Sequence, residues 1–130
     1  MKSVSAVWPA RSPDSSRILY SAASSADAGE GTPAQRVLAK RRIWMGDASR
    51  ASAPRQITGD AGYRDESPVS SCDSKIIFFC RIDSADQRSL WKMNADGTEL
   101  AKMAEFPFGR DAWFGYYGHI AWRRLWDWRR

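Results

Sequence analysis

Short apolar runs, each ended by a polar turn, recur along the chain. Ile18-Leu19-Tyr20 and Ile76-Ile77-Phe78-Phe79 are rich in β-branched and aromatic residues, and continuous apolarity of this length is typical of a strand covered on both faces. Leu90-Trp91-Lys92-Met93 mixes apolar and polar positions and stops at Asn94. Asp96-Gly97 is then predicted to supply the positive φ angles of a two-residue hairpin turn. Residues 89–100 are therefore expected to form a strand, a turn and the start of another strand.

The same unit occurs twice in the sequence. The segment 9–20 matches the segment 68–78, with one residue fewer in the second copy, and each has a turn built on Asp-Ser before an apolar run. Asp14 and Asp73 are expected to close these turns by accepting a hydrogen bond from the backbone two residues on. Further along, 42–47 parallels 89–94, and 54–58 parallels 100–104. The residues that define the repeat are Pro13, Asp14, Trp44, Pro68, Asp73, Trp91, Asn94, Asp96 and Gly97.

Several strands in a unit of roughly 40 to 50 residues are what a β-propeller blade requires. The aspartates are 73 − 14 = 59 residues apart and the tryptophans 91 − 44 = 47, because the first unit has a longer connection, 22–41, rich in Ala, Ser and Gly. This connection is expected to be a flexible surface loop. The predicted organisation is two blades, at about 1–60 and 61–105, followed by a tail over 106–130.

These motifs resemble the TolB-like (WD40-like) β-propeller repeat. Ser12-Pro13-Asp14 and the strand after it, then Ile43-Trp44, follow the family pattern, and Trp91-Lys92-Met93-Asn94-Ala95-Asp96-Gly97-Thr98 matches it best. The segment 63–68 is similar to the lead into a blade in bacterial members. The resemblance covers about 8–103 and implies an all-β fold of two antiparallel blades in an incomplete propeller.

The chain departs from the family pattern at the turns and in the number of blades. The glycine of the Pro-Asp-Gly turn is Ser15 in one copy and Ser74 in the other, which raises the conformational cost of the turn. A propeller closes from typically four to eight blades, so two blades are expected to leave sheet faces open to water. We therefore expect the C-terminal part of a longer propeller, or a short chain that needs copies of itself.

The segment from 106 to 130 differs in character, because nine aromatic residues crowd into it and glycines interrupt its first half. From Ile120 onward apolar residues stand at helical spacing, so a short amphipathic helix and an edge strand both remain open. The tail is a candidate interaction surface. Its candidate residues are Trp113, Tyr116, Tyr117, Trp122, Trp126 and Trp128.

Composition and charge exclude little. The formal net charge is +5, of which five arginines and two aspartates between 110 and 130 contribute +3. One short basic stretch is a weak electrostatic footprint, so neither nucleic acid nor a membrane is the expected partner. Cys72 and Cys80 lack metal-ligand spacing and are expected to be free thiols. The sequence shows no signal peptide and no transmembrane span, which as written indicates the cytoplasm, although similar propellers are often periplasmic.

No catalytic constellation stands out. His119 is the only histidine and has no nucleophile paired with it in the sequence. Asp60, Asp65 and Glu66 form an acidic cluster that matches no calcium loop, so they are interpreted as turn residues and solvated carboxylates. There is no nucleophile elbow, phosphate loop or His-Glu-x-x-His motif. Neither a metal nor a cofactor is predicted.

The sequence therefore favours a non-catalytic propeller fragment that acts as a protein-interaction scaffold. Its expected partners are another protein, further propeller blades or a second copy of the chain. The alternative is the substrate-access propeller portion of a larger hydrolase or lyase.

Overall fold

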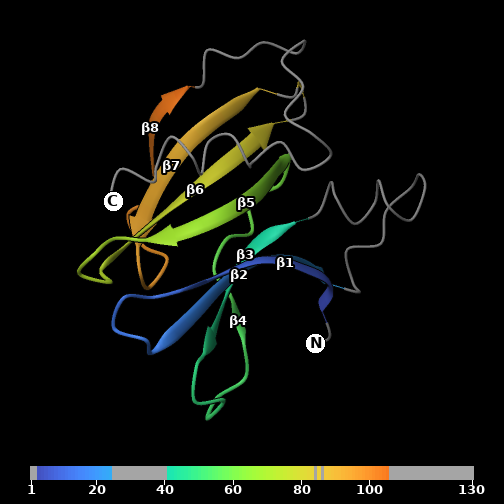
Figure 1. Cartoon of the computed structure of the whole chain (residues 1–130). Coiled ribbons are helices and arrows are strands. Elements are labelled where there is room, and N and C mark those ends of the chain that lie inside the picture. The colour runs from blue at the N-terminus through green and yellow to red at the C-terminus, as the bar shows by residue number, and fades with distance from the viewer. Residues whose placement is uncertain (1–2, 25–40, 84, 86, 106–130) are drawn as a thin grey trace.

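Two four-stranded antiparallel sheets make up the regular structure (Figure 1). The computed structural model describes residues 3–24, 41–83, 85 and 87–105, and these contain no helix. The first sheet runs in chain order through β1 (Ser3–Arg11), β2 (Arg17–Ser24), β3 (Arg42–Asp47) and β4 (Arg55–Gln56). The second runs through β5 (Tyr63–Ser70), β6 (Ile76–Asp83), β7 (Arg88–Asn94) and β8 (Ala101–Glu105). The prediction of an all-β, blade-like fold is confirmed.

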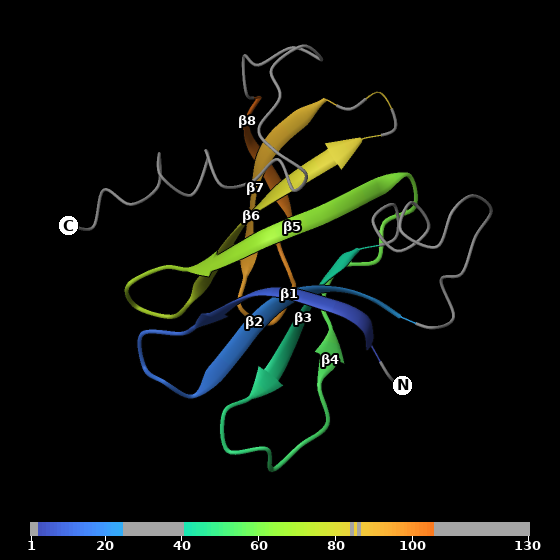
Figure 2. The ribbon, with the colours of Figure 1, turned by 45° about the vertical axis from the view of Figure 1, so that its right-hand side comes forward.

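The two sheets meet along their first strands. β5 packs against β1, β2 and β3 of the first sheet. In Figure 2, β1 and β5 lie side by side in the middle of the molecule while β4 and β8 lie at its far ends. The sheets thus fan out from the inner strands, as neighbouring propeller blades do.

The pairing register shows that the first two strands of each sheet are copies without a deletion. Tyr20 pairs with Trp44 in the first sheet, and Phe79 pairs with Trp91 in the second. The offset between β2 and β6 is 79 − 20 = 59, the same as between the turn aspartates, so the predicted missing residue is wrong. Both β1 and β5 also shift register where a proline stands, between Val7 and Ala10 and between Glu66 and Val69.

The turns before β2 and β6 are built alike. In the first, Asp14 Oδ1 accepts hydrogen bonds from the Ser12 hydroxyl (2.5 Å) and from the Ser16 backbone N–H (2.9 Å). In the second, Asp73 Oδ1 accepts from the Ser71 hydroxyl (2.6 Å) and from the Lys75 backbone N–H (3.0 Å). The hydrogen bonds from two residues on confirm the expected role of the aspartates.

Serine occupies a left-handed backbone position in both of these turns. Ser15 has φ of 63° and Ser74 has φ of 62°. A side chain with a Cβ is disfavoured there by roughly 1–2 kcal/mol relative to an ordinary backbone region. The turns therefore keep the glycine-type conformation although glycine is absent.

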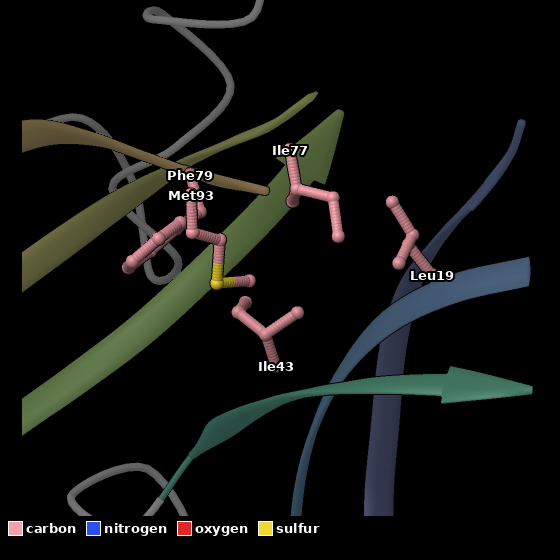
Figure 3. Packing of buried hydrophobic residues seen from close by; sticks show 5 residues of the cluster. All are labelled: Leu19, Ile43, Ile77, Phe79 and Met93. Carbon is pink, nitrogen blue, oxygen red and sulfur yellow. The ribbon is translucent and has the colours of Figure 1, made fainter. Parts of the chain in front are cut away.

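The apolar core lies between the sheets. Leu19 and Ile43 point from the first sheet toward Ile77, Phe79 and Met93 of the second, and all five are at most 2% exposed (Figure 3). Burying a side chain of this kind contributes about 1.5–3 kcal/mol. Neither sheet could form this cluster alone, so the core belongs to the pair.

The opposite face of the second sheet is also buried. Cys80, Ile82 and Leu90 form a second cluster, with Val69 and Phe78 packed against it. The alternation of Ile77 and Phe79 with Phe78 and Cys80 explains why the run is continuously apolar, as predicted. Among the described residues, the large hydrophobic side chains classed as exposed are Leu100 and Met103. The expectation that two blades leave sheet faces open to water stays a prediction.

The turn between β7 and β8 differs from the predicted two-residue hairpin. Gly97 has φ of 89°, but Asp96 does not share a positive φ. The Gly97 backbone N–H donates to the Asn94 carbonyl (2.8 Å), and the Asn94 N–H donates to the Thr98 carbonyl (2.8 Å). The Asp96 carboxylate accepts from the Thr98 N–H, which stabilises a longer loop in which one glycine is sufficient.

β2 extends further than expected. Ala22 and Ala23, assigned to a loop from the sequence, are at most 1% exposed and pair with β1. Small side chains here permit close packing between strands, so the prediction that a flexible loop begins at Ala22 is wrong for residues 22–24. Residues 25–40 lie outside the described residues.

Candidate functional site

The seam between the two sheets, where β5 packs against β1, β2 and β3, contains a buried arginine with several charged and aromatic partners. Arg81 continues the inward-facing series of Ile77 and Phe79 on β6 and is 1% exposed. Its Nε donates to Asp65 Oδ1 (2.7 Å) and its Nη2 to Asp65 Oδ2 (3.0 Å), a two-point ion pair. Its Nη1 donates to Asp60 Oδ2 (2.8 Å). Such pairs hold both groups in a fixed orientation.

Aromatic rings enclose the same guanidinium. The Arg81 Cζ lies 4.7 Å from the ring centre of Tyr63, 4.7 Å from that of Trp91 and 5.4 Å from that of Phe79. These are cation–π distances. Burial disfavours the charged form, but the hydrogen bonds and charges of Asp65 and Asp60 outweigh burial and raise the pKa of Arg81. The group is a permanent cation inside the protein.

A second buried carboxylate has cations of its own. Glu66, with no exposed surface, accepts a hydrogen bond from Arg41 Nη1 (3.1 Å), and Arg64 Nε lies 3.2 Å from the same oxygen. Arg41 directly precedes β3 of the first sheet, whereas Glu66 belongs to β5 of the second. This ion pair therefore links the two sheets.

Further polar contacts cross the seam. The Asp65 backbone N–H donates to the Arg41 carbonyl (3.0 Å), and the Ser21 hydroxyl donates to the Asp65 carbonyl (2.7 Å). The Arg42 guanidinium donates to the Tyr63 carbonyl (2.5 Å). Because buried polar groups are costly without partners, these bonds fix one relative position of the sheets.

The interpretation of the acidic cluster as solvated turn residues is wrong for two of its three members. Asp65 and Glu66 are completely buried, and only Asp60 is about half exposed. The arginines that neutralise them were missed. The available signal was the position of Arg81, which alternates in phase with Ile77 and Phe79 directly after an apolar run.

The two repeat tryptophans occupy matching positions but have different surroundings. Trp44 stacks on Tyr20 with ring centres 6.4 Å apart and is 4% exposed. Trp91 donates from Nε1 to the Ser89 hydroxyl (2.8 Å) and covers the Arg81 guanidinium. Both belong to packing within and between the sheets.

Two adjoining hollows open at one edge of the sheets, which we call the rim. The turns before β2 and β6 and the loops between β3 and β4 and between β7 and β8 form this rim. The first, about 590 Å³, lies between the sheets and is lined by residues from the turns and strands of both. The second, about 540 Å³, lies beside it in the first sheet. Arg17, Met45 and Arg55 line both hollows, and Lys75 and Asp96 line the first. Met45 and Ala95 also pack against the central core, so the first hollow lies over one end of it.

The described residues hold few groups suited to chemistry. They contain no cluster of His, Cys, Asp and Glu that could hold a metal ion. Both cysteines are free thiols, and burial together with nearby Glu66 raises the pKa of Cys80 to about 12. His119 and the six aromatic residues proposed as an interaction surface lie outside the described residues. Over the part of the chain that is described, no helix has the length and apolarity needed to cross a membrane.

Comparison with solved structures identifies the class of fold. The chain is similar to a putative TolB from Agrobacterium tumefaciens, with a TM-score of 0.62 and 20% identity over 84% of this chain and 34% of that one. It is similar to TolB from Acinetobacter baumannii, with a TM-score of 0.57 and 19% identity over 77% of this chain and 21% of that one. A chain from a nidogen/laminin complex matches with a TM-score of 0.52 and 17% identity over 81% of this chain and 34% of that one.

These matches define the chain as a piece of β-propeller architecture. Its two sheets are propeller blades. More particularly, they have the fold of TolB-like blades, as the repeat motifs imply, and the chain spans about a third or less of the chains it matches. No family model and no curated protein matches the sequence.

Proposed function

We propose that the chain is a non-catalytic propeller segment that presents its rim turns to a protein partner. The observation that carries this proposal is the seam: five core residues and the Arg41–Glu66 ion pair join the two blades. A rigid joint of this kind holds turns from both blades in a constant arrangement. Recognition by loops on a fixed scaffold is the usual way in which such folds bind partners.

The chemistry of the described residues supports a binding role over catalysis. The carboxylates of Asp65 and Glu66 already bind arginines, so neither is free to accept a proton from a substrate. The Cys80 thiol is buried and its pKa is far above neutral. A nucleophilic cysteine needs the opposite environment, with a lowered pKa and access to solvent.

The solved neighbours support the same direction. One of them comes from a nidogen/laminin complex, in which proteins associate with each other. By analogy at the level of fold, we infer a protein as the partner here, which includes further blades or a second copy of this chain. An arrangement with further blades would add turns to the same rim.

Site-specific photo-crosslinking in the native host tests the proposal. A photoreactive amino acid at Ser52, on the β3–β4 rim loop, should give a discrete crosslinked protein, whereas one at Lys102 on β8 should not. Ser52 lines the second hollow, and Lys102 lies on the outermost strand. Absence of any protein adduct from Ser52 and from further rim positions would contradict a scaffold. If the full-length parent instead cleaved a polymer that crosslinks at the rim, the substrate-access alternative would replace it.

A further inference from the structure

Three cationic side chains line the rim hollows, and each lies near enough to an aspartate to lower its pKa, Arg55 to Asp96, Arg17 to Asp14 and Lys75 to Asp73. Arg17 and Arg55 line both hollows and Lys75 lines the first. Within the described residues, none of the three forms an ion pair. Arg55 and Lys75 are exposed and Arg17 is partly exposed, so all three can reach a ligand.

The two carboxylates that line the hollows are occupied by their own turns. Asp96 Oδ1 accepts from the Thr98 hydroxyl (2.6 Å) and N–H (2.9 Å). Asp47 Oδ1 accepts from the Ser49 hydroxyl (2.8 Å) and N–H (2.9 Å). These hydrogen bonds lower the pKa of both aspartates. Both aspartates therefore stay negatively charged at neutral pH, and the three cations leave the lining of the two hollows with a net charge of 3 − 2 = +1.

Two apolar side chains, Met45 and Ala95, line the first hollow. Met45 and Ala95 are partly exposed there while packing against the central core. Each hollow has a volume in the range of ligand-binding clefts, about 300–1,000 Å³. A lining that holds both cations and apolar groups suits a chain that alternates carboxylates with small apolar side chains.

We propose that the two hollows form one groove, the rim groove, that binds an extended acidic peptide segment of a partner protein, with Arg17 and Arg55 contacting carboxylates of the peptide. Arginine matches a carboxylate at two points, which gives orientation as well as attraction. The fixed charges of Asp47 and Asp96 repel a continuous phosphate backbone but can fall between the separated carboxylates of a peptide. This proposal deepens the proposed scaffold function and rests on it.

Fluorescence anisotropy with defined probes tests the groove. The main probe is a labelled twelve-residue peptide in which Glu alternates with Ala, and the matched control has Lys in place of Glu. The wild-type chain should bind the acidic peptide only, and binding should weaken with salt because exposed charges are screened over about 8 Å at physiological ionic strength. The double variant Arg17→Glu, Arg55→Glu should weaken binding by about tenfold or more.

Controls separate the outcomes. Lys92→Glu changes an exposed charge on β7 that lines neither hollow, and it should change binding less than about twofold. Arg17→Gln with Arg55→Gln repeats the test without introducing charge, and circular dichroism establishes that each variant is folded. Equal binding by wild type and both double variants would overturn the proposal.

Other ligands give distinct results. Tighter binding of a twelve-nucleotide single strand than of the acidic peptide would assign the groove to nucleic acid. Complete displacement of the peptide by millimolar inorganic phosphate would reduce it to a site for a single anion. If the acidic peptide does not bind although Ser52 crosslinks to a protein, the peptide assignment fails and the scaffold function stands. If neither occurs, both fail.

Discussion

Replacing Arg81 by methionine should destabilise the protein strongly. The change keeps a long apolar side chain in the seam but removes the cation from a site that is 1% exposed. Asp65, with no exposed surface, would lose both hydrogen bonds to its carboxylate, and Tyr63 and Trp91 would lose the cation between them. The seam would then contain a buried charge without its partner.

The magnitude follows from the burial of the two partners. Breaking a buried ion pair from one side costs about 3–5 kcal/mol, because the remaining charge is neither hydrated nor paired. The bond to Asp60 adds less, because that carboxylate is 53% exposed and water can replace its partner. We therefore expect Arg81→Met to lower the free energy of unfolding by about 3–5 kcal/mol, a large part of the 5–15 kcal/mol typical of a domain.

Urea unfolding followed by far-ultraviolet circular dichroism measures this loss without relying on the fluorescence of Trp91. Arg55→Met, an exposed arginine, is the control and should change the free energy of unfolding by less than about 0.5 kcal/mol. Asp65→Ala combined with Arg81→Met should cost about 2 kcal/mol less than the sum of the single changes, because the charges depend on each other. A loss below about 1 kcal/mol for Arg81→Met, or strict additivity in the double variant, would refute the reasoning.

Three further changes test the turns. Ser15→Gly should raise the free energy of unfolding by about 0.5–1 kcal/mol, because glycine accepts φ of 63° without strain. Ser52→Gly is the control, because Ser52 is exposed and has no positive φ, and this change should not stabilise the protein. An equal gain in stability from both changes would contradict the explanation by backbone strain. Gly97→Val should lower the free energy of unfolding by about 1–3 kcal/mol, because Gly97 has φ of 89° and an added Cβ would lie 3.0 Å from a side-chain carbon of Ile57. Gly59→Ala is the control. An unchanged melting temperature for Gly97→Val would contradict the turn geometry. Hydrogen bonds from neighbouring serines lower the pKa of Asp14 from 3.8 to about 2, so the stability that its carboxylate provides is present above pH 3.8 and lost as the pH falls toward 2. The melting temperature of Asp14→Asn should therefore depend less on pH over this range than that of the wild type. Identical pH profiles for the two proteins would refute this prediction.

The fold was accessible from the sequence because its determinants are local. Asp14 and Asp73 start their strands by hydrogen bonds to residues two positions away, and the strands repeat the same order of apolar and polar residues. Patterns of this kind are visible without knowing what lies opposite a strand. The repeat therefore indicated propeller blades, and its TolB-like motifs indicated the kind of blade.

The ion pairs of the seam could not be predicted from local sequence in the same way. The buried partners of Glu66 and Asp65 are arginines 25 and 16 positions away. Arg64 is close to Glu66 in the sequence, but a neighbouring arginine alone does not distinguish a buried carboxylate from a solvated one. Only the phase of Arg81 in its strand indicated burial. The extent of β2 was missed for a related reason, because alanine and serine are common both in loops and where strands pack closely.

The rim groove depends on two sheets at once. Arg17 and Arg55 come from the first sheet, whereas Lys75 comes from the turn before β6. Their convergence follows from the angle at which the blades meet. A sequence pattern does not contain that angle.

Amide hydrogen exchange at Asp65 tests the central claim, that the two blades form one folded unit, most directly. The Asp65 N–H donates to the Arg41 carbonyl across the seam, whereas the amides of Phe79 and Cys80 lie within β6 of one sheet. If the blades open together, the opening free energy of the Asp65 amide, measured by nuclear magnetic resonance, should match those of the β6 amides. An Asp65 amide that exchanges as fast as an exposed turn, while β6 stays protected, would show that the blades separate and would contradict the account.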